Sequence, residues 1–270
     1  MNVSAYLDRI GYTGDVTPNA ENLAALVWTH RLRVPYESLD LWLDRRVSLE
    51  TDALFDKIVT RRRGGYCFEL NGLFAQLLRE LGYEVQEYAG RWLRDWQPGR
   101  PLRRTHRVVC VRLGTDPAQL VDVAIAPAFL QAPLPIVLDQ PQALRGRRHR
   151  ILRDARLGLV VEALPSNGTW QWLFSFDAAP QLPGDFELAN WWCQTHPDSI
   201  FHKGFLVFQQ TEDGGWKALE CKEPRAHVGV LTVKFVVHRG TGEETSTQIV
   251  GETALKDVLA ASFGIEGWSL

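Results

Sequence analysis

The sequence predicts an α+β fold, with helices first and an antiparallel sheet after them. Apolar residues recur at helical spacing up to Gly82, and beyond it the apolar pattern changes toward a period of two. The strand candidates in the middle of the chain are short and have no helices between them, which favours an antiparallel sheet or barrel over a doubly wound fold. The last part, roughly residues 190–270, combines further strand candidates with one terminal helix.

The composition is that of a globular protein of ordinary polarity. Of its 270 residues, 45% are hydrophobic and 23% are charged, and the formal net charge is −2. This balance gives no general attraction to nucleic acid or to an anionic membrane. No apolar run reaches the ~18 residues of a membrane span, and Asp8 interrupts the N-terminal stretch where a signal peptide needs apolar residues. We therefore expect a cytoplasmic protein with no nucleic-acid or membrane partner.

The cysteines argue against a metal site and against a disulfide scaffold. They lie far apart in the sequence and form no Cys-x-x-Cys pair. The spacing of Cys193, His196 and His202 fits no zinc-binding pattern. We expect free thiols and no bound metal.

The first 82 residues carry the signals of several helices. Thr17-Pro18 is typical of an N-cap followed by a first-turn proline, and Val34-Pro35-Tyr36 then breaks that helix into an extended segment. Thr51 is expected to cap another helix, whose inner face carries Leu54, Phe55, Ile58 and Val59. The last turn of this helix carries three arginines, Arg61, Arg62 and Arg63, which either complement the helix C-terminus or lie near an active site.

Cys67 is the most informative residue of the chain. It follows the Gly64-Gly65 break and precedes an apolar stripe at helical spacing that ends at Gly82. A cysteine in the first turn of a helix meets unpaired backbone N–H groups and the positive end of the helix dipole, which favour its thiolate. The dipole lowers a thiol pKa by only about one unit from ~8.5, so an imidazolium partner is also needed. The chain has to supply a histidine.

The remaining elements are assigned from alternation and turn residues. Strands are expected at 83–93, 107–113, 119–125, 157–163 and 170–176, then at 205–210, 216–219 and 231–237, with a helix at 255–263. Asp116-Pro117 indicates a turn between the second and third of these strands. The polar stretch 94–104 and the proline-containing stretch 126–141 are expected to be loops.

A histidine and an acid follow Cys67 in the order of a thiol triad. His106 stands at the start of one strand candidate, and Asp122 lies among apolar neighbours in the next. In such a triad the histidine takes the thiol proton, and the acid orients the imidazole and stabilises its charged form. Each residue also has a structural interpretation: a buried cysteine, a surface histidine at a strand end, and an acid that binds a loop backbone.

The simplest hairpin separates the histidine from the acid. A tight turn at Asp116-Pro117 places Asp122 opposite about Val111, which leaves His106 roughly 16 Å away at ~3.3 Å per residue. A direct bond between the two side chains requires an offset register, a bulge or a twist. We predict such an irregularity.

Several segments resemble the arylamine N-acetyltransferases. The stretch from Arg62 to Asn71, Arg-Arg-Gly-Gly-Tyr-Cys-Phe-Glu-Leu-Asn, resembles the signature of that family. Four further segments resemble family segments in the same order: Val34–Asp40, Thr105-His106, Leu120–Val123 and Thr195–Phe201.

The resemblance implies both a fold and a reaction. It implies a helical bundle over 1–82, a β-barrel over 83–190 and an α/β lid over 191–270, with a core like that of cysteine proteases and transglutaminases. It implies that Cys67 is the acyl-accepting nucleophile, His106 its base and Asp122 the orienting acid. An acetyl group then moves from acetyl-CoA, a cosubstrate rather than a permanently bound cofactor, through a Cys67 thioester to an aromatic amine or hydrazine. The protein is expected to be a monomer or homodimer, and the expected substrate contacts are Tyr36, Ile125, Phe129 and Phe201.

One departure from the family pattern concerns the acceptor. The family usually has Val-Gly-Phe-Gly after the aspartate, whereas this chain has Val123-Ala124-Ile125-Ala126. The alanines restrict the backbone if a positive φ is required there, and Ile125 replaces an aromatic ring. We therefore expect aryl amines to bind weakly or selectively, with Phe129 as the side chain that restores an aromatic wall.

Other interpretations remain open. The basic run Arg145–Arg153 either contacts the phosphates of CoA or forms a solvated loop. The protein could instead be an amide synthase that uses a carrier-bound acyl chain, a thiol hydrolase with the same triad, or an inactive homologue that acts as a binding protein.

Overall fold

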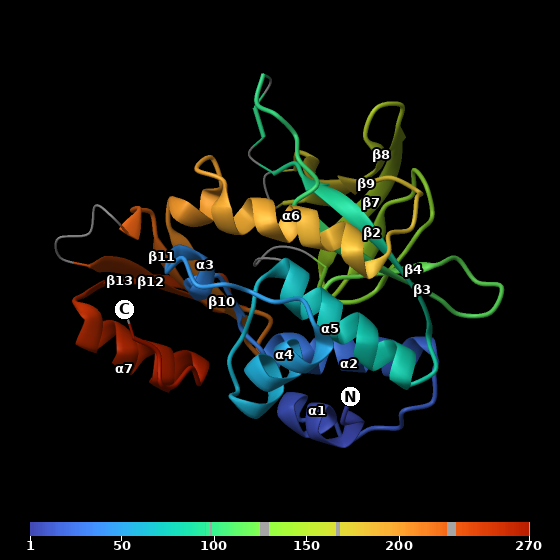
Figure 1. The fold of residues 1–270 in the computed structure, drawn as a ribbon. Helices are drawn as coiled ribbons and strands as arrows, with labels where there is room; N and C mark the ends of the chain where they lie inside the picture. Colours follow the sequence, from blue (N-terminus) through green and yellow to red (C-terminus); the bar gives the residue numbers. More distant parts are fainter. Residues whose placement is uncertain (95, 98, 125–129, 166–167, 226–230, 270) are drawn as a thin grey trace.

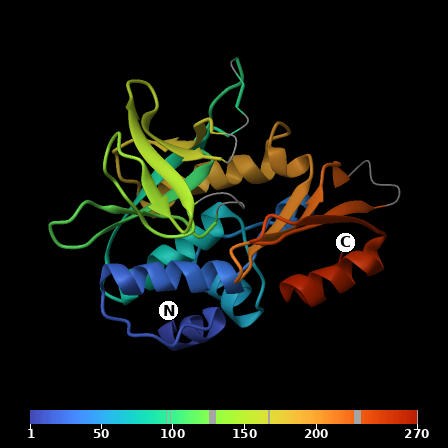
Figure 2. The same ribbon diagram turned by 180° about the vertical axis from the view of Figure 1, so that it is seen from behind.

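The computed structural model describes residues 1–94, 96–97, 99–124, 130–165, 168–225 and 231–269, and it confirms the α+β class. N-terminal helices form one part of the molecule, a nearly closed eight-stranded antiparallel barrel a second, and a five-stranded sheet a third (Figures 1 and 2). Helix α6 (Pro183–Thr195) lies over the helix that begins with Cys67, where Phe186 meets Phe68 with ring centroids 6.0 Å apart.

The described helices lie mainly in the N-terminal part. In chain order they are α1 Val3–Ile10, α2 Ala20–Arg33, α3 Leu39–Trp42, α4 Thr51–Phe55, a π-helical turn Asp56–Thr60, α5 Cys67–Glu80, α6, a 3₁₀ turn Ile200–His202 and α7 Glu252–Phe263.

Two antiparallel sheets contain the strands. The barrel has the order β5-β4-β3-β2-β9-β8-β7-β6, from β2 Glu84–Trp92, β3 His106–Arg112, β4 Gln119–Val121, β5 Leu134–Pro135, β6 Gln142–Leu144, β7 Arg147–Asp154, β8 Gly158–Leu164 and β9 Gln171–Phe176. The second sheet has the order β1-β10-β11-β12-β13, from β1 Tyr36–Glu37, β10 Phe205–Gln210, β11 Trp216–Cys221, β12 Thr232–His238 and β13 Glu244–Val250.

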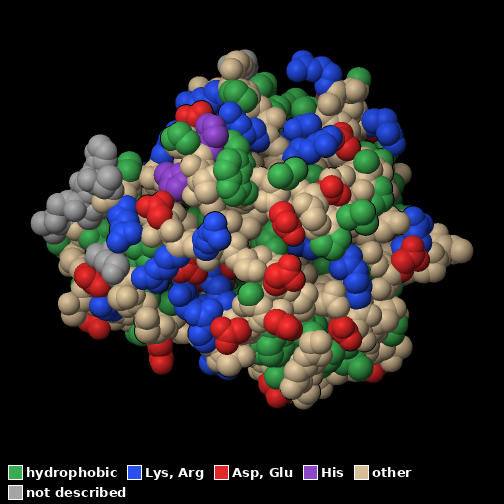
Figure 3. Space-filling model, viewed as in Figure 1, with side chains coloured by type: hydrophobic (Ala, Val, Ile, Leu, Met, Phe, Trp, Pro, Cys, Tyr) green, Lys and Arg blue, Asp and Glu red, His purple; other side chains and the backbone are tan. Residues whose placement is uncertain are grey.

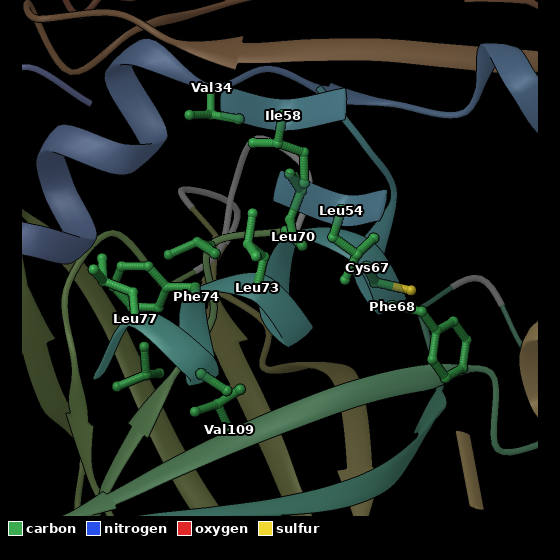
Figure 4. Close-up of a cluster of buried hydrophobic side chains, with 14 of the residues drawn as sticks. Val34, Leu54, Ile58, Cys67, Phe68, Leu70, Leu73, Phe74, Leu77 and Val109 are labelled. Atoms are coloured by element: carbon green, nitrogen blue, oxygen red, sulfur yellow. The ribbon is translucent and has the colours of Figure 1, made fainter. Parts of the chain in front are cut away.

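Helix α5 occupies the centre of the largest core. Its apolar side chains are buried against residues of α4, the π-helical turn and β3, as Figure 4 shows for Leu54, Ile58 and Val109. At ~25 cal/mol per Å² of buried apolar surface, this stripe is a main source of stability for the N-terminal part. Because α5 is held on several sides, the residue at its first position is held as well.

The predicted caps of two N-terminal helices were wrong by one or two residues. Asn19, rather than Thr17, caps α2, since its side-chain oxygen accepts a hydrogen bond from the Asn22 backbone N–H at 2.8 Å. Thr51 is the first residue of α4, and Glu50 occupies the cap position without a side-chain bond.

The basic run in the barrel is a strand, so the prediction of a solvated loop was wrong. Residues 147–154 form β7, which pairs with β8 from Arg148 to Asp154. His149 and Ile151 are buried, whereas Arg148 is exposed and Arg150 half-buried. The charges concealed this period-two alternation.

Several elements were not predicted, among them α6 and β13. α6 begins with Pro183, and Asp185 accepts a hydrogen bond from the Leu182 backbone N–H at 2.8 Å, which is a recognisable helix start. β13 carries polar residues on nearly every position and is mostly exposed, so it lacks an apolar pattern. The division into three domains stays a prediction; α6 runs across its boundary at residue 190, and Leu39 and Trp42 belong to the core of the second sheet.

The visible surface carries charges of both signs. On the face shown in Figure 3, lysine and arginine side chains are interspersed with aspartate and glutamate. None of the described helices has the length and apolar character that a membrane crossing requires.

The burial of His30 leads us to predict that the folded protein loses stability in mild acid. It is buried against Tyr6 and Phe74, and neither ring nitrogen has a hydrogen-bond partner among the described residues. Burial lowers the pKa of His30 to about 3, and the charges of Arg9 and Arg31 add to the effect. The unfolded chain therefore binds a proton near pH 6.5 that the folded protein binds only near pH 3. The stability contributed by neutral His30 is present above about pH 6.5 and is lost at about 1.4 kcal/mol per pH unit below it.

Denaturant titrations between pH 7.5 and 4.5 test this expectation. The His30→Leu variant should lose less unfolding free energy than wild type over this range, while a His196→Gln control, at a position whose side chain is 37% exposed, should follow wild type. A His30→Leu variant with the wild-type pH dependence would contradict the prediction.

Candidate active site

Cys67 is the first residue of α5, as predicted from the glycine pair before it. Tyr66 precedes it in an extended conformation, and the carboxylate of Glu69 accepts the Tyr66 backbone N–H at 3.0 Å. The thiol donates a weak hydrogen bond to the carbonyl oxygen of Thr105 at 3.5 Å, the residue before His106. In Figure 4 the sulfur points away from the labelled leucines of its own helix. The side chain therefore faces the start of β3 and not the centre of the core.

His106 and Asp122 are in direct contact. The His106 Nε2 and Asp122 Oδ2 atoms are 2.6 Å apart, and both side chains are buried. Val109 pairs with Val121 and Val111 with Gln119, so Asp122 lies level with Val108. The register of the predicted tight hairpin, which placed Asp122 opposite Val111, was wrong by three residues because the loop between the strands spans 113–118. The offset register reduces the separation between His106 and Asp122 to two residues, or roughly 7 Å along the strand. The two side chains bridge this distance.

Asn71 holds the acid in place and was not singled out as a functional residue from the sequence. Its amide nitrogen donates to Asp122 Oδ1 at 3.0 Å and to the Arg107 carbonyl at 2.7 Å. Its oxygen accepts the Val123 N–H at 3.0 Å, and the Ala124 N–H donates to Asp122 Oδ1 at 2.9 Å. Asn71 lies four residues after Cys67, hence on the same face of α5, and that spacing is the signal that was available.

The electrostatics of the three residues depend on one another. Burial alone would lower the pKa of His106, but the Asp122 carboxylate outweighs it and raises that pKa to about 10. Burial raises the pKa of the Cys67 thiol, and the hydrogen bond and charge of His106 oppose this rise. Asp122 engages Nε2, so the other ring nitrogen, Nδ1, is free to exchange a proton with the sulfur. The imidazolium, more than the helix dipole, is what can stabilise a thiolate here.

A buried network of ion pairs supports the turn before Cys67. The Lys57 ammonium lies 2.8 Å from Glu69 and 2.7 Å from Asp40, and the Arg63 guanidinium lies 2.6 Å from Glu37. Burial alone would lower the pKa of Lys57, but the surrounding carboxylates outweigh it and raise that pKa above its ordinary value.

The three predicted arginines have different positions. Arg61 forms an exposed pair with Asp56, Arg62 has a positive φ of 52°, and Arg63 is buried in the ion-pair network. Arg63 supports the turn before Cys67 through its pair with Glu37, and a position of these arginines near the active site stays a prediction.

The residues considered for a metal do not converge. Cys193 is buried in α6, His196 stacks on Trp192 and His202 lies 3.2 Å from Asp44. No cluster of three metal-ligating side chains occurs among the residues that the structure describes. Two surface cavities, of about 700 Å³ between α5 and α6 and about 480 Å³ beside β10 and β11, are lined by other residues than Cys67, His106 and Asp122.

Comparisons with known proteins identify the family. Residues 19–267 match the model of an N-acetyltransferase family. The arylamine N-acetyltransferase of Mycolicibacterium smegmatis is 38% identical over 98% of this chain and 92% of its own length, and that of Mycobacterium tuberculosis is 35% identical over 98% and 89%. This chain belongs to the arylamine N-acetyltransferase family.

Solved structures of the family have the same fold. The arylamine N-acetyltransferase of M. tuberculosis has a TM-score of 0.85 at 34% identity, and its alignment covers 98% of this chain and 93% of that chain. The Mycobacterium marinum enzyme in complex with CoA has a TM-score of 0.84 at 32% identity, with the same coverage. The resemblance on which the predicted fold class and enzyme class depended is confirmed.

The substrate contacts predicted for this arylamine N-acetyltransferase lie partly within the described residues. Half-buried Tyr36 is in β1, where burial raises its pKa well above the usual value and the nearby Cys67 adds to the rise. Phe201 is buried with its ring 5.3 Å from that of Tyr66. Ile125 and Phe129, together with Ala126, lie outside the described residues. Ala124 does not have a positive φ, so alanine at this position brings no backbone strain.

Proposed function

We propose that this enzyme transfers an acetyl group from acetyl-CoA to the nitrogen of an arylamine or arylhydrazine through a thioester on Cys67. The observation that carries the proposal is the contact of His106 with both Asp122 and Cys67 at the start of α5. Family membership supports the substrate classes, since relatives are named arylamine N-acetyltransferases and one was solved with CoA.

The geometry supports a two-stage reaction. In the first stage His106 takes the proton of Cys67, the sulfur attacks the acetyl carbonyl carbon, and the bond from that carbon to the CoA sulfur breaks. The departing CoA thiolate takes the proton back from His106. In the second stage the amine nitrogen attacks the acetyl-cysteine, His106 accepts a proton from that nitrogen, and the Cys67 sulfur leaves as the free thiol after reprotonation. Asp122 stabilises the imidazolium in both stages.

Exchange of an acetyl group between two thiols is nearly neutral in energy, so the first stage needs no metal and no permanently bound cofactor. Proposed contacts of the acceptor are Tyr36 and Phe201, with Ile125 and Phe129 in the segment that departs from the family pattern. The cytoplasm as the site of action, and a monomer or homodimer as the functional unit, also remain proposals.

Intact mass measurement after incubation with acetyl-CoA tests the proposal. Wild type should gain one acetyl group, and addition of an arylamine or hydrazine should remove it and yield the acetylated acceptor. The Cys67→Ala variant should gain nothing. An unmodified wild-type protein would overturn acetyl transfer and shift weight to an amide synthase, a thiol hydrolase or a binding protein. A panel of acceptors in the second step then tests the expectation that aryl amines bind weakly or selectively.

A further inference from the structure

Arg31 of α2 contacts the backbone of Asp122, the acid of the candidate triad, although α2 is far from β3 and α5 along the chain. The side chain is buried, with 3% of the residue exposed, and its Nη1 donates to the Asp122 backbone carbonyl oxygen at 3.2 Å. The β3–β4 ladder ends at Val121, so this carbonyl lies just beyond the paired part of the strand. Helix α2 thus anchors the backbone of a residue whose side chain is held by α5 and β3.

The charge of Arg31 also acts on Asp122. Burial lowers the pKa of Arg31 to about 10, and the Asp122 carboxylate opposes that lowering, so the guanidinium remains positive at neutral pH. A buried cation is costly unless an opposite charge compensates it.

The charged and titratable groups around this position come from four further elements. His106 of β3 and Cys67 of α5 form the triad with Asp122, and Arg147 of β7 adds a second positive charge near Arg31. Cys193 of α6 is close enough to Cys67 to influence it when ionised. The Asp122 carboxylate otherwise receives neutral donors, the amide of Asn71 and the N–H of Ala124.

We propose that Arg31 is a positioning residue of the acetyl-transfer reaction, which anchors Asp122 from α2 and, through its positive charge, sets the pH range in which Cys67 reacts. The inference rests on the proposed function, because it assigns to Arg31 a role in the Cys67–His106–Asp122 triad.

The sign of the charge effect follows from electrostatics. Removing a positive charge makes protonation of every neighbouring group more favourable, so the pKa of the Cys67 thiol in the Cys67–His106 pair should rise. The rate at which Cys67 reacts should rise with pH as the thiol loses its proton, and this rise is the acid limb of the pH profile. A neutral residue at position 31 should therefore move the acid limb to higher pH. Loss of the anchor should also lower kcat without changing the KM for acetyl-CoA, because the contact of Arg31 is with Asp122 and the change therefore acts through the triad.

The test is the rate of Cys67 alkylation by iodoacetamide between pH 5 and 9, followed by peptide mass spectrometry, with kcat and KM for acetyl-CoA measured beside it. Arg31→Met removes the charge and the hydrogen-bond donors, Arg31→Gln removes the charge and keeps an amide donor, and Arg31→Lys keeps the charge. The exposed Arg33→Met on the same helix is the matched control.

Arg31→Met and Arg31→Gln should shift the acid limb upward by about 0.5–1 pH unit, and Arg31→Met should lower kcat about 10- to 100-fold at unchanged KM. Arg31→Lys should restore the wild-type limb, and Arg33→Met should match wild type. If Arg31→Met does not fold, Arg31→Gln carries the test of charge. Neutral variants with the wild-type limb would overturn the proposal, as would an Arg31→Lys limb shifted like theirs. Failure of wild type to accept acetyl from acetyl-CoA overturns the proposed function instead, since alkylation of Cys67 needs no CoA.

Discussion

Replacing Asp122 with asparagine is expected to lower the kcat of acetyl transfer by about 10³- to 10⁴-fold while the fold stays intact. The reason lies in the 2.6 Å contact between Asp122 Oδ2 and His106 Nε2. An asparagine amide turned toward Nε2 would donate to it, which places the ring proton on Nδ1, the nitrogen that must accept the thiol proton. The neutral amide also removes the charge that raises the pKa of His106 to about 10 against the effect of burial.

Single-turnover acetylation of Cys67, followed by mass, is the measurement, with far-UV circular dichroism as the check on folding. The Asp116→Asn variant changes an exposed aspartate in the loop of the same hairpin and serves as the matched control. An Asp122→Asn variant that acetylates within a factor of ten of wild type would show that the carboxylate is not the orienting acid.

Replacing Lys57 with methionine is expected to destabilise the protein by about 3–5 kcal/mol, the usual cost of breaking a buried ion pair from one side. The Lys57 ammonium bridges Glu69 at 2.8 Å and Asp40 at 2.7 Å, and the Glu69 side chain is only 2% exposed. Burial raises the pKa of Glu69, and Lys57 is the first of the groups that oppose the rise. Without the ammonium, Glu69 must either stay charged without compensation or take up a proton and weaken its cap on the Tyr66 N–H.

Denaturant unfolding at pH 7.5 measures the loss. The control is Arg61→Met, which removes an ion pair with Asp56 in which the two side chains are 57% and 56% exposed, so a loss of about 0–1 kcal/mol is expected there. Equal losses in the two variants would refute the view that the network under Cys67 contributes substantially to stability.

The local part of the fold was predictable from the chain alone. The Gly64-Gly65 break and the apolar stripe after it placed Cys67 in the first turn of α5, where the structure has it. Most strands were predicted near their observed bounds because alternating apolar residues pack on one face of a sheet. Among the strands that were missed or misassigned, β13 and β7 have exposed or charged residues that concealed the alternation.

The arrangement of the site required tertiary information. His106 and Asp122 were identified by type and order, but their contact depends on a hairpin register that residue types in the loop at 113–118 do not specify. Asn71, Arg31 and the Lys57 network act through contacts between segments far apart in the chain. The pattern of apolar residues in the sequence indicates only which positions are buried and not which partners they contact.

The candidate nucleophile, its helix, the order of the candidate triad and the family could be inferred from the chain alone, because these depend on local backbone preference and on residues at short spacing. The contact of the acid with the histidine, and the buried Arg31 of α2 at the backbone of that acid, became visible from the packing of the folded chain. Hydrogen bonds and ion pairs between distant segments need donor–acceptor distances of about 3 Å, met to within a few tenths of an ångström, and packing of the whole chain sets those distances.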